Sequence, residues 1–92
     1  DQSLLSIQNF KKAIAIERNA ESLLALAVAL KNSNLEQSIL LAKEALSNDP
    51  KYVSFEYREE QLWGQKLQRE TIKLFKQEKI KKYIAEANLY KN

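Results

Sequence analysis

The sequence repeats itself at a fixed spacing, and this repeat limits the folds open to a chain of 92 residues. When the chain is displaced by 32 residues, four positions near the start of the chain meet identical ones: Ser6 and Ser38, Ile7 and Ile39, Lys11 and Lys43, Ala13 and Ala45. Further along, Leu23 meets the apolar Phe55, and Leu30 meets an identical residue, Leu62. Self-similarity at this kind of period is typical of arrays in which each repeat is one supersecondary unit. The spacing therefore predicts stacked helical units.

The composition and the apolar spacing predict an all-α fold of five or six helices. The chain has one Gly, one Pro and 29% charged residues, which suits solvated helices. Leu23, Leu26, Ala27 and Leu30 form a helical stripe at i, i+3, i+4 and i+7. Comparable stripes predict helices over residues 2–16, 20–31, 35–47 and 51–63, and a fifth from residue 65.

Capping and breaking residues mark the ends of these segments. Asn19 is placed to cap the second helix, and Asp49-Pro50 ends the third. Gly64, the only glycine, is expected at a helix C-terminus in the left-handed conformation. The apolar phase slips after Phe75, which predicts a break between Gln77 and Lys79 and then a sixth helix. One continuous helix over residues 65–90 is the alternative.

The best-formed unit, residues 19–50, resembles a tetratricopeptide repeat. Ala27, Ser38 and Ala45 are small at the positions where that family packs its two helices closely, and Pro50 follows the second helix. The spacing is two residues shorter than the family's usual repeat, and an asparagine or serine replaces the turn glycine. The resemblance implies one domain over residues 1–92: a second helix (1–18), the repeat (19–50), a degenerate repeat (51–77) and a capping helix (78–92).

What the resemblance implies is an antiparallel helix-hairpin α-solenoid whose first helices line a concave groove that binds a peptide or partner helix. By position, the groove residues are Glu21, Leu24, Ala25, Val28, Lys31, Asn32, Glu56, Tyr57, Glu60 and Trp63. Leu24 and Val28 have an alternative place in the core or beneath a further upstream repeat. Glu56 and Glu60 would repel a peptide carboxylate, which argues against a carboxylate clamp.

The charges divide the chain into two parts and raise a second candidate function. Residues 66–92 hold eight basic and three acidic residues, a net of +5, whereas residues 1–65 hold seven and nine, a net of −2. Lys66, Arg69, Lys73 and Lys76 form one basic stripe on a helix. Such a stripe predicts salt-dependent binding of nucleic acid or an acidic surface. The alternative is a solvated outer face.

The remaining residue types argue against an enzyme. There is no Cys, His or Met, so thiol and imidazole chemistry and metal sites built from those groups are excluded. The carboxylates of Glu56, Glu59 and Glu60 are expected to be surface charges, and no cofactor or metal is expected.

No apolar run is long enough for a membrane span, and a cytoplasmic location is expected. The chain begins without Met inside a helical pattern, as a fragment would. A third possibility is therefore a segment of a longer solenoid, or self-association through an apolar N-terminal face, Leu4, Ile7, Phe10 and Ile14.

Overall fold

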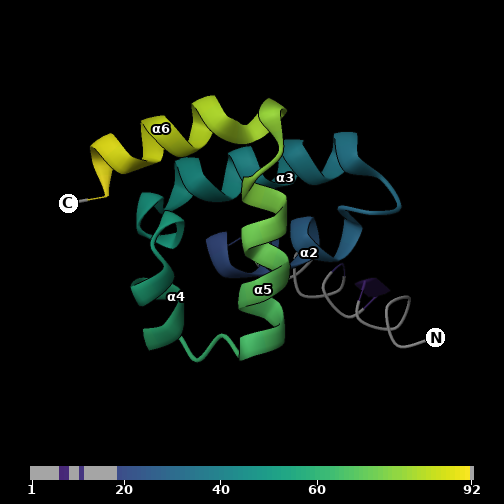
Figure 1. The fold of residues 1–92 in the computed structure, drawn as a ribbon, viewed down its shortest axis with the longest axis horizontal. Helices are drawn as coiled ribbons and strands as arrows, with labels where there is room; N and C mark the ends of the chain where they lie inside the picture. Colours follow the sequence, from purple (N-terminus) through teal and green to yellow (C-terminus); the bar gives the residue numbers. More distant parts are fainter. Residues whose placement is uncertain (1–6, 9–10, 12–18, 92) are drawn as a thin grey trace.

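The computed structural model describes residues 7, 8, 11 and 19–91, and all regular structure in this part of the chain is helical (Figure 1). The α-helices are α2 (Ala20–Leu30), α3 (Leu35–Asn48), α4 (Phe55–Glu60), α5 (Gln65–Phe75) and α6 (Lys81–Tyr90). Two 3₁₀ turns, η1 (Pro50–Val53) and η2 (Glu78–Ile80), precede α4 and α6. The predicted all-α class is confirmed. The helix predicted over residues 2–16, with most of its apolar face, lies outside the described residues.

Helices α2 and α3 pack against each other as a hairpin, and a local cap begins each helix at the residue that the sequence predicts. The Asn19 side chain accepts a hydrogen bond from the backbone N–H of Ser22 at 2.8 Å. Asn34 does the same for Gln37 at 3.2 Å. Each cap satisfies one amide that has no partner inside its helix.

Small residues let α2 and α3 approach closely. Ala27, Ala42, Ala45 and Ser38 have no exposed surface. The Ser38 hydroxyl donates to the Ala27 carbonyl at 2.5 Å. At the end of α2 the N–H of Lys31 donates to the carbonyl of Val28 and not to that of Ala27. The Ser38 hydroxyl therefore supplies a donor to a carbonyl near the helix end.

The prediction of one helix over residues 51–63 is wrong. The chain makes η1, becomes extended at Ser54 (ψ 129°), and starts α4 at Phe55. The Ser54 hydroxyl accepts from the N–H of Tyr57 at 3.3 Å and so caps α4. The break separates Tyr52 from Phe55 and Leu62, which a single helix would place along one face. Tyr52 is buried from η1, whereas Phe55 is 43% exposed and Leu62 is 91% exposed.

The predicted role of Gly64 is also wrong. Helix α4 ends in a Schellman motif, with Trp63 N–H donating to the Arg58 carbonyl and Leu62 N–H to that of Glu59. Leu62, not Gly64, holds the left-handed position, with φ of 67°. Gly64 has φ of −68° and precedes α5 as its N-cap residue.

The predicted break near residue 78 is confirmed, and the continuous helix is not formed. Helix α5 ends at Phe75, η2 turns the chain, and α6 runs back along α3 and η1 (Figure 1). The turn buries Ile80, and α6 buries Ala87. Helix α5 packs on α2, where Lys31 forms an ion pair with Glu70. No helix in the described part of the chain is both long and apolar enough to cross a membrane.

Candidate functional site

The candidate site is a hollow of about 250 Å³ between α4 and α5, called here the Trp63 hollow. Seven residues line it, from the two helices and the turn between them: Phe55, Glu59, Trp63, Gln65, Gln68, Arg69 and Ile72. Phe55 and Ile72 are partly open to solvent, at 43% and 39%, whereas Trp63 is only 6% exposed. The hollow therefore has an aromatic floor and apolar walls that water reaches.

The Schellman turn fixes Trp63 at the base of the hollow. Because Leu62 takes the left-handed conformation, the chain reverses at once and Trp63 turns back toward η1. There its ring lies 5.9 Å from that of Tyr52, with the planes tilted by 45°. The indole is thus held by backbone hydrogen bonds and by an aromatic neighbour.

A buried polar network holds α4 against α5 beneath the hollow. Arg58 is 2% exposed. Its Nε donates to Gln68 Oε1 at 2.7 Å, and its terminal nitrogen donates to the Tyr52 carbonyl at 2.8 Å. Gln68 in turn donates to the Phe55 carbonyl at 3.0 Å. Burial lowers the pKa of Arg58 to about 10, so its guanidinium remains protonated at neutral pH.

The stacking of Arg58 on an aromatic ring completes this network. The guanidinium carbon lies 5.1 Å from the centre of the Phe75 ring, a cation–π distance. No carboxylate among the described residues forms an ion pair with it. The buried charge is stabilised by hydrogen bonds and a ring, which fixes the spacing of α4 and α5.

The rim of the hollow carries opposite charges on its two sides. Glu59 lies on the α4 side and Arg69 on the α5 side. Both are exposed, and neither forms an ion pair with any residue that the structure describes. Glu56 and Glu60 of α4 and Lys66 of α5 are also exposed, although they do not line the hollow. The hollow therefore separates an acidic helix from a basic helix.

The structure divides the predicted groove residues among different environments. Leu24, Ala25 and Val28 are buried in the core. Lys31 is nearly buried and bonded to Glu70 at 2.5 Å. Trp63 lies in the hollow. The remaining predicted groove residues are wholly or partly exposed: Glu21, Asn32, Glu56, Tyr57 and Glu60.

The predicted basic stripe is exposed along α5 and its C-terminal end. Lys66, Arg69 and Lys76 form no ion pair among the described residues. Lys73 is partly neutralised, because its ammonium lies 2.9 Å from Glu70. Hydrogen bonds from Lys31 and then from Lys73 hold the pKa of Glu70 at about 2.

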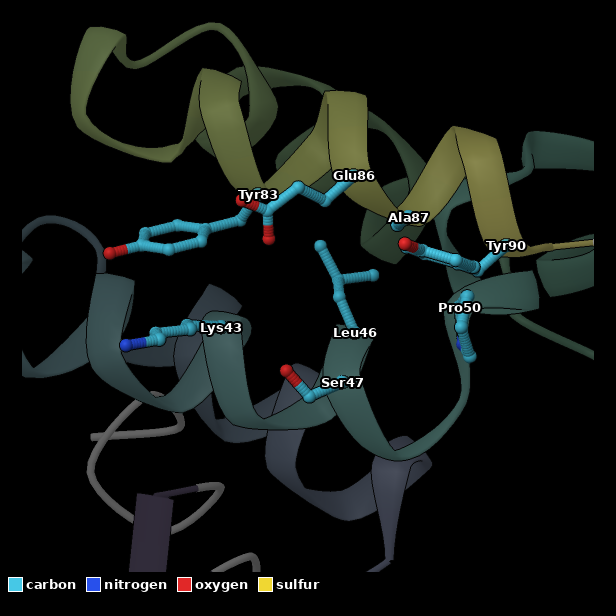
Figure 2. Close-up of a pocket in the computed structure, with 8 residues that line it drawn as sticks. All are labelled: Lys43, Leu46, Ser47, Pro50, Tyr83, Glu86, Ala87 and Tyr90. Carbon is cyan, nitrogen blue, oxygen red and sulfur yellow. The ribbon is translucent and has the colours of Figure 1, made fainter.

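A second hollow, of about 320 Å³, lies between α3 and α6 (Figure 2). Leu46 extends from α3 toward α6, with Tyr83 toward one end and Tyr90 toward the other. Lys43 lies 5.2 Å from the centre of the Tyr83 ring, and Lys82 lies 5.0 Å from it. The contact of Lys43 attaches α6 to α3, whereas that of Lys82 lies within α6, and the hollow is the unfilled space between the two helices.

A third, more open hollow lies where α2 begins and α3 ends, and it is lined by Asn19, Ala20, Glu21, Asn48, Asp49 and Tyr52. Burial, followed by the charge of Glu21, raises the pKa of Tyr52 to about 12. The phenol is therefore neutral at physiological pH. Among the described residues no group of carboxylates is placed to hold a metal ion.

Comparisons with protein-family models, with curated proteins and with solved structures found no match. The candidate site therefore depends on its own geometry. Sequence reasoning named Arg69 for the basic stripe and Trp63 for the groove, but it did not place Ile72 or Gln68 in a site. The sequence gives little indication of their role. Both belong to α5, and their position opposite α4 follows only from the short length of α4 and the turn after it.

Proposed function

We propose that the chain is a non-enzymatic protein-interaction module that receives an apolar side chain of its partner in the Trp63 hollow. The single observation that carries the proposal is the solvent-facing pair Phe55 and Ile72 above a fixed tryptophan. Buried aromatic anchors in small pockets supply most of the binding energy in many protein interfaces. Unpaired charges on both rims would orient the partner.

We also propose a helical-repeat architecture of the tetratricopeptide type, with residues 19–50 as the repeat. The contact between Ser38 and Ala27 supports it, because small residues stand where α2 and α3 meet. In this proposal the interaction surface moves from the concave groove to the Trp63 hollow. The reason is that Leu24 and Val28 are buried and Lys31 is bonded to Glu70.

A displayed peptide library screened on this chain, followed by NMR, tests the proposal. The chain has one tryptophan, so its indole signal reports on the hollow alone. We expect selected peptides to shift the Trp63 indole and the amides of Phe55 and Ile72. Peptides that shift only Glu21, Asn32 and their neighbours would contradict the proposal.

Matched substitutions distinguish peptide binding in the Trp63 hollow from nonspecific binding to exposed apolar side chains. Phe55→Glu removes one apolar wall and keeps the helix, because a carboxylate in the first turn of α4 is favourable. Leu40→Glu is the control, since Leu40 is a large, 62% exposed apolar residue of α3 that does not line the hollow. We expect Phe55→Glu to lose peptide binding and Leu40→Glu to retain it.

Binding of a polyanion is the second candidate function. It is favoured by Lys66, Arg69 and Lys76, which have no ion-pair partner among the described residues. It predicts retention on a polyanion resin at low salt, reduced by Lys66→Glu and Lys76→Glu. Passage through the resin without retention would exclude it.

A further inference from the structure

We infer that the partner of the Trp63 hollow is a second copy of this chain, in a two-fold dimer; this inference rests on the proposed interaction function. Helices α4 and α5 run in opposite directions, because a short turn joins them (Figure 1). The lining residues therefore pair by level across the hollow: Phe55 opposite Ile72, and Glu59 opposite Arg69.

A closed dimer with one two-fold axis brings the same patch of both copies together, so the patch must complement itself. An axis that runs along the hollow, parallel to the two helices, places α4 of one copy against α5 of its partner. Phe55 then meets Ile72 of the second copy, and Glu59 meets Arg69 of the second copy.

Only an arrangement that crosses α4 with α5 brings opposite charges together, because the charged residue that lines the hollow is Glu59 on α4 and Arg69 on α5. Glu59 and Arg69 lie on facing rims and form no ion pair inside the described chain. A two-fold dimer forms that pair twice and covers the exposed parts of Phe55 and Ile72. Acidic and basic rims on one patch thus favour a copy of the same chain over a partner of one charge.

Charge-exchange variants test the arrangement. In Arg69→Glu the contact becomes two glutamate pairs, and in Glu59→Lys it becomes two cationic pairs. We expect each variant alone to raise the dimer dissociation constant at least about tenfold, as like charges across an interface do. In an equimolar mixture, each variant finds opposite charges on the other, so we expect association to return to the wild-type level. The double variant Glu59→Lys with Arg69→Glu should also dimerise.

Sedimentation velocity over a wide concentration range is the assay, with Trp63 fluorescence as a local reporter and circular dichroism to verify folding. Lys79→Glu is the control for net charge, because Lys79 follows α5 and does not line the hollow; it should dimerise as the wild type does. A wild-type chain that stays monomeric at every concentration would overturn the inference. A mixture that associates no better than its components would overturn it too. If peptides nevertheless bind the hollow of a monomer, the proposed function stands without self-association.

Discussion

Replacing Leu62 by glycine should stabilise this protein, because the turn after α4 holds a leucine where the backbone favours glycine. Leu62 has φ of 67°. A side chain with a Cβ is disfavoured there by roughly 1–2 kcal/mol. Burial of the leucine side chain offsets little of this conformational penalty, since the side chain is 91% exposed.

The net gain is smaller than the conformational penalty. Glycine loses more freedom on folding than leucine does, at a cost of about 0.5–1 kcal/mol. The difference leaves Leu62→Gly more stable by about 0.5–1 kcal/mol. For a domain of this size, that gain corresponds to a rise in melting temperature of about 3–6 °C.

Thermal and urea unfolding, followed by circular dichroism and by Trp63 fluorescence, measure this effect. Leu62→Ala is the matched control, because alanine removes the exposed side chain but keeps the Cβ and its penalty. We expect Leu62→Ala to lie within about 0.5 kcal/mol of the wild type. If Leu62→Gly is no more stable than Leu62→Ala, the reasoning from backbone strain is refuted.

Three further substitutions probe contacts elsewhere in the fold. Ser38→Ala leaves the buried Ala27 carbonyl without the Ser38 hydroxyl and should lower the free energy of unfolding by about 1–3 kcal/mol in urea titrations; an unchanged midpoint would disprove this. The pKa of Glu70 is lowered from 4.5 to about 2 by hydrogen bonds from Lys31 and Lys73. The stability that ionised Glu70 adds to the fold is therefore present above pH 4.5 and is lost as the pH falls toward 2. Glu70→Gln should therefore lose less stability than the wild type between pH 4.5 and pH 2. If the two proteins lose the same stability over this range, the prediction is wrong. The pKa of Tyr52 is raised from 10.0 to about 12, so its contribution is complete below pH 10 and is lost as the pH rises toward 12; Tyr52→Phe should flatten alkaline unfolding, and identical profiles would speak against this reading.

Much of the fold was accessible to sequence reasoning because it depends on neighbours within one helical turn. The predicted cap at Asn19 bonds to the amide three residues further on, and Asn34, which was not predicted as a cap, does the same. The turn at Ser54 uses the same kind of bond to Tyr57, yet it was missed because Tyr52, Phe55 and Leu62 continue an apolar stripe across it. Apolar spacing outweighed a weak capping signal in that prediction.

The candidate site was predictable only in fragments. Arg69 was identified as one cation of a basic stripe, and Trp63 as one residue of a groove. Their meeting with Phe55 and Ile72 required the short length of α4 and the immediate reversal at Leu62. A leucine in the left-handed conformation has no reliable local signature, since the sequence offers Gly64 nearby as the more favourable candidate.

The all-helical class, the cap at Asn19 and the break before the last helix could be predicted from the sequence, because the hydrogen bonds and side-chain spacing that produce these features are local. The stripe of Leu23, Leu26, Ala27 and Leu30 is buried as its spacing suggests, but the burial of other residues became known only from the tertiary structure. It buried Leu24, Val28 and Arg58 and bonded Lys31 to Glu70, 39 positions further along the chain. Burial depends on which helices meet, and that depends on turns whose geometry is set by the packing of the whole chain.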